Sequence, residues 1–213
     1  MEEAVFRSPK KRGRLAVFLS GRGSNFLALA EAAGAGRINA EVGLVLSNKP
    51  EAPGLLKARE MGLETLWLNP KGFGSREDYD AAAMKEVEAR GIDLICLAGY
   101  MRIVTPGFCE AWKYRMMNIH PALLPSFPGL EAQKQALEWG VKFSGCTVHF
   151  VFAEVDMGPI ILQSVVPVHQ DDTEESLAAR ILVEEHKTYA EAVRLYFEGR
   201  VEVRGRRVFI LEK

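Results

Sequence analysis

An asparagine and a histidine end an apolar run in the stretch MMNIHPALLPSFPGL, residues 116–130. Asn118 and His120 are two positions apart, so on an extended backbone their side chains point to the same side. The prolines that follow restrict the backbone and keep it out of a helix. An amide and an imidazole held side by side can donate hydrogen bonds and move a proton. A strand histidine is often structural, so the pair alone leaves both interpretations open.

A carboxylate that could act with His120 lies in the segment FAEVDMGP, residues 152–159. Asp156 stands close to Gly158-Pro159, between two apolar runs. Contact with His120 would stabilise the imidazolium and raise its pKa, because opposite charges favour the charged form. The alternative is an aspartate in a solvated hairpin turn, and spacing alone favours that alternative.

A second kind of chemistry is indicated by SGRGSN, residues 20–25, between an apolar run and a helical pattern. Glycines allow a tight turn, and the free N–H groups of the next helix can hold an anion. The loop is neither GxGxxG nor GxxxxGK[ST], so it predicts a single phosphate monoester rather than a dinucleotide or nucleoside triphosphate. The alternative is a plain strand-to-helix turn capped by Ser24 or Asn25.

The loop AGYMRIV, residues 98–104, follows the most continuous apolar run of the chain. Its mixture of aromatic, aliphatic and cationic side chains could line a groove for a flat, partly polar ligand. A surface loop with Arg102 in solvent is equally consistent with the pattern.

Of the remaining histidines, we expect His149 to pack within its strand with a satisfied hydrogen bond and His169 to be exposed.

The elements that must position these groups alternate along the chain. Strands are predicted over 15–20, 40–48, 64–70, 93–99, 116–119, 146–151 and 160–168. Helices are predicted over 26–36, 55–62, 75–90, 108–112, 131–140 and 173–198, and a hairpin over 201–211 turns at Gly205. Alternating strands and helices predict an α/β fold: one domain with an open, twisted, mostly parallel sheet and mixed C-terminal edge strands. Ligands of such sheets bind beyond the carboxyl ends of the strands.

Composition limits the other possibilities. The chain has 213 residues, 48% hydrophobic content and a formal net charge of -1, which gives no reason to expect nucleic acid or a membrane surface as a partner. Three cysteines without CxxC spacing fit a reducing cytoplasm better than a disulfide framework and form no zinc pattern. We expect residues 1–13 to be a disordered basic extension and 14–213 to be the domain. Because residues 1–13 are rich in lysine and arginine, the alternative is that this extension is an arm that binds nucleic acid.

Together, the segments closely resemble the folate-dependent formyltransferases, in the branch that acts on a phosphoribosyl glycinamide. The matching pieces are FLSGRGSN, VLSNKP, AGYMRIV, MMNIHPALLP, GCTVHFV, EVDMGPIILQ and ARILVEEH, in family order from about residue 14 to 200. The resemblance implies a Rossmann-like formyltransferase fold in a cytoplasmic enzyme of purine biosynthesis. It also implies small-molecule substrates, 10-formyltetrahydrofolate as cosubstrate, no metal, and a monomer or homodimer.

The resemblance assigns roles to residues at the matching positions. Asn118 would bind the formyl oxygen, a protonated His120 would assist and shuttle protons, and Asp156 would orient His120 and raise its pKa. The substrate phosphate and ribose would be bound by Gly23, Ser24, Asn25 and Glu185. The folate would be bound by Arg76, Met101, Arg102, Ile103, Val104, Phe152, Ala153, Glu154 and Val155.

Two positions depart from the family pattern. Ala122 replaces the more usual serine, and Glu131-Ala132-Gln133 stands where some members carry histidines, so the polar lining beside the phosphate is expected to differ. Among relatives, methionyl-tRNA formyltransferase and formyltetrahydrofolate hydrolase carry an additional domain, for which we expect no room here. A non-catalytic ligand-binding protein is the other alternative, but binding alone would not need Asn118, His120 and Asp156 together.

Overall fold

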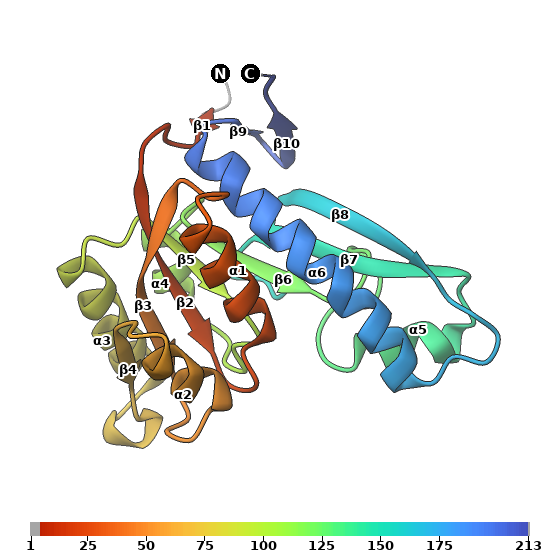
Figure 1. The fold of residues 1–213 in the computed structure, drawn as a ribbon, viewed down its shortest axis with the longest axis horizontal. Helices are drawn as coiled ribbons and strands as arrows, with labels where there is room; N and C mark the ends of the chain where they lie inside the picture. Colours follow the sequence, from red (N-terminus) through yellow and green to blue (C-terminus); the bar gives the residue numbers. More distant parts are fainter. Residues whose placement is uncertain (1–4, 213) are drawn as a thin grey trace.

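A seven-stranded sheet forms the centre of the protein in a computed structural model that describes residues 5–212 (Figure 1). Its strand order is β4-β3-β2-β5-β6-β7-β8. The strands are β2 (Gly13–Leu19), β3 (Ala40–Ser47), β4 (Thr65–Trp67), β5 (Leu94–Leu97), β6 (Met116–His120), β7 (Phe143–Phe150) and β8 (Ile160–Pro167). The first five strands in the spatial order are parallel to one another. Strand β7 pairs antiparallel with β6 on one side and with β8 on the other. The predicted fold class is therefore confirmed.

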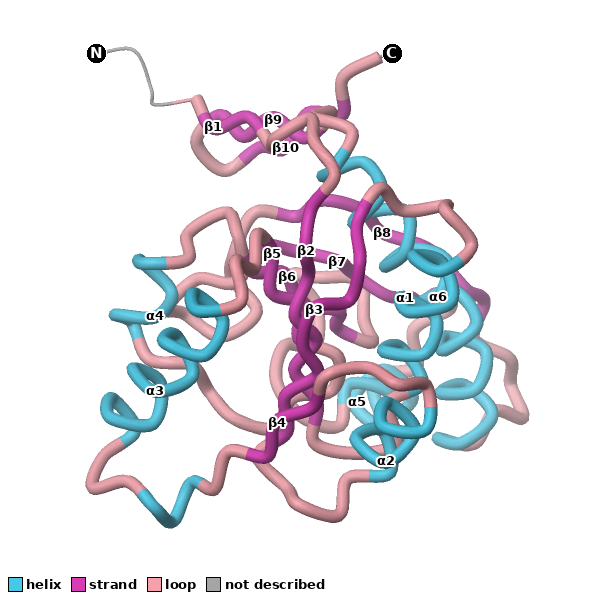
Figure 2. Tube along the Cα trace, turned by 60° about the vertical axis from the view of Figure 1, so that its left-hand side comes forward, coloured by secondary structure: helices cyan, strands magenta, loops and turns pink. Residues whose placement is uncertain are grey.

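Helices cover both faces of this sheet (Figure 2). One face carries α1 (Ser24–Gly34), α2 (Pro53–Glu60), α5 (Ala132–Trp139) and α6 (Glu174–Phe197). The other carries α3 (Arg76–Ala89) and α4 (Pro106–Ala111), and a 3-10 turn, η1 (Pro70–Gly72), follows β4. Within the described part of the chain, the helices are too short or too polar to span a bilayer.

The central strands are apolar on both sides because the sheet separates two buried clusters. In β2, Leu15, Val17 and Leu19 face the cluster under α1 and α6. Ala16 and Phe18 face the second cluster, under α3 and α4. A strand covered on both faces reads as a continuous apolar run rather than an alternating one. This explains why residues 15–20 were recognisable as a strand from the sequence.

A second, three-stranded sheet joins the two ends of the chain (Figure 1). It consists of β1 (Phe6–Arg7), β9 (Val201–Arg204) and β10 (Arg207–Ile210), in the order β1-β9-β10 with antiparallel pairing. The predicted hairpin is confirmed, and its turn contains Gly205 at φ 55°. A positive φ costs glycine little, which suits it to this turn.

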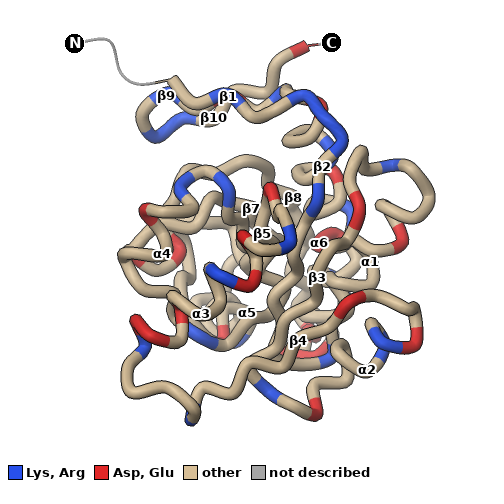
Figure 3. The backbone as a smooth tube through the Cα atoms, turned by 90° about the vertical axis from the view of Figure 1, so that its left-hand side faces the viewer, with Lys and Arg blue, Asp and Glu red and all other residues tan. Residues whose placement is uncertain are grey.

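The N-terminal segment differs from its predicted disorder. Residues 1–4 lie outside the described residues, but Phe6 and Arg7 pair with β9, and Arg7 forms an ion pair with the buried Glu202. Lysines and arginines gather along the β9–β10 hairpin and near the start of β2 (Figure 3). Several have carboxylate partners, such as Lys11 with Asp93 at 2.6 Å. This segment is held in place by ring packing and ion pairs with residues that are distant in the sequence.

Gly145 provides a test of how closely β7 and β8 approach. A Cβ atom at Gly145 would overlap the backbone carbonyl oxygen of Ser164 on β8. We expect Gly145→Ala to lower the free energy of unfolding by about 2–3 kcal/mol, because backbone atoms cannot rearrange as a flexible side chain can. Urea denaturation measures this. Gly107→Ala, at an exposed position of α4 with free space around it, is the control and should change stability by less than about 1 kcal/mol. Equal effects at both positions would contradict the close approach.

Candidate active site

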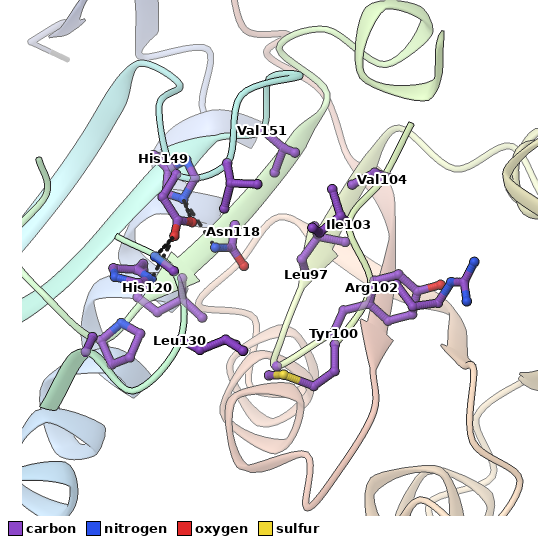
Figure 4. Close-up of a pocket in the computed structure, with 18 of the residues that line it drawn as sticks. Leu97, Tyr100, Arg102, Ile103, Val104, Asn118, His120, Leu130, His149 and Val151 are labelled. Atoms are coloured by element: carbon purple, nitrogen blue, oxygen red, sulfur yellow. Dashed lines mark hydrogen bonds and ion pairs between the residues drawn. The ribbon is translucent and has the colours of Figure 1, made fainter. Parts of the chain in front are cut away.

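A pocket of about 670 Å³ lies where β5 and β6 end (Figure 4). Its walls come from the loop after β5, the end of β6, residues 129–133, and the loop between β7 and β8. Most of the residues predicted for catalysis and folate binding line it: Met101, Arg102, Ile103, Val104, Asn118, His120, Phe152, Ala153, Val155 and Asp156. The fold therefore brings together three segments of chain that are distant in sequence.

The carboxylate of Asp156 lies between two histidine rings in this pocket. Its Oδ2 is 3.3 Å from Nδ1 of His120, and its Oδ1 is 3.5 Å from Nε2 of His149. The N–H of Gly129 donates a further hydrogen bond to Oδ2, at 2.8 Å. The Asp156 side chain is only 9% exposed, so the alternative of a solvated hairpin turn is wrong.

The surroundings of Asp156 keep its carboxyl group ionised. Burial raises the pKa of the carboxyl group, but the hydrogen bonds from His149 and Gly129 and the nearby His120 lower it more, and the net shift is downward. A buried charge is tolerated only when it is paired and hydrogen-bonded. Asp156 is therefore a fixed negative charge against which both rings can hold a proton.

The pKa of His120 departs from the sequence-based prediction. Burial lowers this pKa, and although Asp156 and the Phe127 carbonyl act to raise it, the net direction is downward. The predicted influence of Asp156 is present, but desolvation of a ring that is 4% exposed outweighs it. The expected net rise is thus corrected. Nε2 of His120 lies 2.8 Å from the Phe127 carbonyl oxygen, which can only accept, so Nε2 carries a proton.

His149 is a site residue that sequence reasoning missed. It is directly opposite Asn118 in the antiparallel pairing of β6 with β7, and Asn118 Nδ2 lies 3.2 Å from His149 Nε2. Nδ1 of His149 donates to the Phe150 carbonyl at 2.9 Å. Nε2 therefore lies between the Asn118 amide and the Asp156 carboxylate. The expected satisfied, buried histidine is confirmed, but its partners belong to the site.

Two predicted folate-binding residues lie outside the pocket lining, namely Arg76 and Glu154. Arg76 donates from Nη2 to the Ile103 carbonyl at 2.9 Å, so it supports the pocket loop from behind. Arg102 stacks over the Tyr79 ring at 4.1 Å and points away from Asn118 and His120 in Figure 4. The alternative of a surface loop with Arg102 free in solvent is therefore wrong, because the guanidinium packs on a ring.

Several lining residues were not predicted, among them Tyr100, Leu130 and Val151. Leu130 is 76% exposed in the ligand-free chain and reaches into the pocket opening (Figure 4). An exposed large apolar side chain at a pocket mouth is typical of a surface that a ligand covers. The feature of the sequence that could have indicated Leu130 is the proline-rich loop, which carries this residue next to Gly129.

The predicted anion-binding residues form a separate group at the end of β2. Gly23 has φ 74° and precedes α1, whose first turn has no side-chain cap, so the alternative of capping by Ser24 or Asn25 is wrong. A Cβ atom at Gly23 would lie 2.7 Å from Cα of Gly54, which is too close for any side chain. The uncapped N–H groups remain available to an anion.

Glu185 of α6 joins this group through a buried contact. Asn25 Nδ2 donates to Glu185 Oε2 at 2.7 Å, and burial raises the pKa of Glu185. The pair connects the start of α1 to α6 beside the uncapped helix end. These four residues, Gly23, Ser24, Asn25 and Glu185, do not line the 670 Å³ pocket. The predicted site residues thus form two separate groups, one in an apolar pocket with an Asn/His/Asp centre and one at a helix start.

Comparison with known proteins agrees with this geometry. A model of the family described as formyl transferase matches residues 13–193. The crystal structure of glycinamide ribonucleotide transformylase 1 from Symbiobacterium toebii superposes with a TM-score of 0.92, at 52% identity over 94% of each chain. Phosphoribosylglycinamide formyltransferase from Escherichia coli is 41% identical over 89% of both chains.

A longer protein also contains a matching region. The trifunctional purine biosynthetic protein adenosine-3 of Drosophila melanogaster is 48% identical over 89% of this chain, which spans only 14% of that protein. The match over residues 13–193 includes both groups of predicted site residues and covers most of the 213 residues. The chain belongs to the formyltransferase family.

Proposed function

We propose that this chain is a phosphoribosylglycinamide formyltransferase of de novo purine biosynthesis. It transfers the formyl group of 10-formyltetrahydrofolate to the glycinamide amine of 5'-phosphoribosylglycinamide. The observation that carries the proposal is the contact of Asp156 with His120, at 3.3 Å, beside Asn118 at the wall of a pocket. The similarity to the Escherichia coli enzyme of that name over 89% of both chains supports the substrate assignment.

The reaction is an acyl transfer between two nitrogens. The amine adds to the formyl carbon, and the formyl oxygen becomes negatively charged in a tetrahedral intermediate. The bond from that carbon to N10 of the folate then breaks, while a proton lost by the amine is delivered to N10. A donor placed at the developing oxyanion is typically worth about 3 kcal/mol. Asn118 and the protonated form of His120 supply such donors.

Asp156 and His149 prepare these donors before the substrate binds. Asp156 opposes the loss of the His120 proton and fixes the ring, since Oδ2 faces Nδ1. Nε2 of His149 lies 3.2 Å from Nδ2 of Asn118 and would orient that amide so that it can donate to the formyl oxygen. The Phe127 carbonyl accepts a hydrogen bond from Nε2 of His120, and the reacting groups would take the place of that carbonyl.

The two groups of site residues would hold the two substrates. The 670 Å³ pocket, with aliphatic residues such as Ile103 and Val155 on its walls, suits the flat folate ring. Backbone N–H groups after Gly23 would bind the phosphate, and Glu185 would face the ribose or glycinamide part. Arg76 and Glu154 do not line the pocket, and they would contact the part of the folate that extends beyond it.

The proposed activity is tested by mixing the protein with 10-formyltetrahydrofolate and the phosphoribosyl glycinamide and following the absorbance change of the folate. We expect turnover that requires the amine. Folate consumption without the amine would instead identify a hydrolase, and an absence of turnover in both mixtures would identify a binding protein. Either result would reject the proposed transfer.

The role of His120 is tested by His120→Ala. We expect kcat to fall at least about a hundredfold, because a positioned acid–base group contributes about 10²–10⁴ in rate. Circular dichroism checks that the fold is retained. His169→Ala, which removes an exposed imidazole outside the pocket, is the control and should retain activity. Near-normal kcat in His120→Ala would remove His120 from the mechanism.

The balance between burial and Asp156 predicts the titration of His120. We expect its pKa to lie below about 6.5, the ordinary value, because burial disfavours the charged ring. Asp156→Asn removes the charge that favours the protonated ring, so the pKa should fall further. NMR titration of the ring C–H signals measures both values, with His149→Gln used to separate the neighbouring ring. A pKa that rises in Asp156→Asn would contradict the ion pair.

A further inference from the structure

We propose that Phe6 positions the folate-facing loop, residues 152–156, through a stack of aromatic rings. The rings that Phe6 meets are those of Tyr114, Phe150 and Tyr196, none of which lines the pocket, so its role is one of positioning rather than catalysis. The catalytic part of this inference rests on the proposed function, while its structural part does not. The site is thereby extended to β1, at the edge of the second sheet.

The first contact in the stack is between Phe6 and Tyr114. Their ring centroids are 4.8 Å apart with an interplanar angle of 27°, which is a stacked arrangement. Phe6 also meets Phe150 edge-on at 6.2 Å and stacks with Tyr196 at 6.4 Å. Aromatic pairs at these separations contribute beyond the apolar area that they bury. Phe6 is thus held among rings from the α4–β6 turn, β7 and α6.

Tyr114 carries the contact onward to the pocket. Its ring centroid lies 5.7 Å from that of Phe152, which lines the pocket and begins the folate-facing loop. The Lys113 ammonium lies over both rings, 5.9 Å from Tyr114 and 5.7 Å from Phe152. Asp156 follows four residues later in the same loop. A displacement of the Tyr114 ring would therefore free the start of the loop that ends in the catalytic carboxylate.

The backbone of Tyr114 is in a conformation that needs external support. Its φ of 58° is in the left-handed region, which a bulky residue rarely occupies unless its surroundings hold it there. The Arg115 N–H closes the turn on the Trp112 carbonyl at 2.8 Å. Stacking by Phe6 on one side and packing against Phe150 at 5.5 Å hold the ring in place.

Phe6 is in turn fixed by strand pairing. It is opposite Val203 of β9, and the next residues are tied by the ion pair of Arg7 with Glu202 and by the Ser8 N–H donating to the Val201 carbonyl at 2.9 Å. The loop itself is open to solvent, with Val155 48% exposed. The ring stack therefore gives this solvent-exposed loop a point of attachment to the rest of the fold.

The structural test compares hydrogen–deuterium exchange in the ligand-free full chain and in Phe6→Ala. We expect faster exchange of the backbone amides in residues 150–158 of the variant. Phe6→Tyr, which keeps the ring, should restore the original exchange. Phe209→Ala is the control, since it removes a ring of β10 that packs on Arg204 and Arg207 rather than on Tyr114. Unchanged exchange in Phe6→Ala would overturn the inference.

The catalytic test separates the two substrates. In Phe6→Ala we expect KM for 10-formyltetrahydrofolate to rise about threefold to about tenfold, the effect of losing one aromatic pair, with KM for the amine substrate little changed. Equal rises in both KM values, or the same rise in Phe209→Ala, would indicate general destabilisation and overturn the inference. If the unmodified chain transfers no formyl group, the proposed function fails, and the exchange experiment still decides the role of Phe6.

Discussion

The site depends on one buried negative charge shared between two imidazole rings. Asp156 carries this charge, with His120 at 3.3 Å and His149 at 3.5 Å. An ionised carboxylate in a nearly closed environment requires partners, and removal of any partner leaves an uncompensated charge. The ends of β6 and β7 and the loop after β7 must therefore keep their relative positions. The rest of the sheet and the helices on its two faces maintain that arrangement.

The same burial that strengthens these contacts limits how firmly His120 keeps its proton. Desolvation favours the neutral ring, whereas Asp156 and the Phe127 carbonyl favour the charged ring. A group that must both give and receive a proton works best when neither form is strongly preferred. The opposition of burial and charge pairing thus suits proton transfer, which a fully stabilised ion pair would hinder.

The sequence was sufficient for the parallel sheet, because strands such as 15–20 are buried on both faces and read as uninterrupted apolar runs. It also pointed to Asn118, His120 and Asp156, through their places at strand and loop ends and through family resemblance, and the structure brings these three side chains to one pocket. It was insufficient for His149, because its importance comes from lying opposite Asn118 on another strand. It also failed for Phe6, whose order depends on rings more than a hundred residues away in sequence, and for the net pKa direction of His120, which depends on how deeply the ring is buried.

The cross-strand register of β6 with β7 makes the chain unevenly tolerant of changes in length. Asn118 is opposite His149, and successive residues of a strand face opposite sides of the sheet. Deleting one residue from β7 before His149 would therefore place Phe150 opposite Asn118 and remove the imidazole from the site. The tip of the β9–β10 hairpin at Gly205 has no such constraint. Natural length variation and engineered insertions should accordingly accumulate at the hairpin tip and be excluded from 143–149.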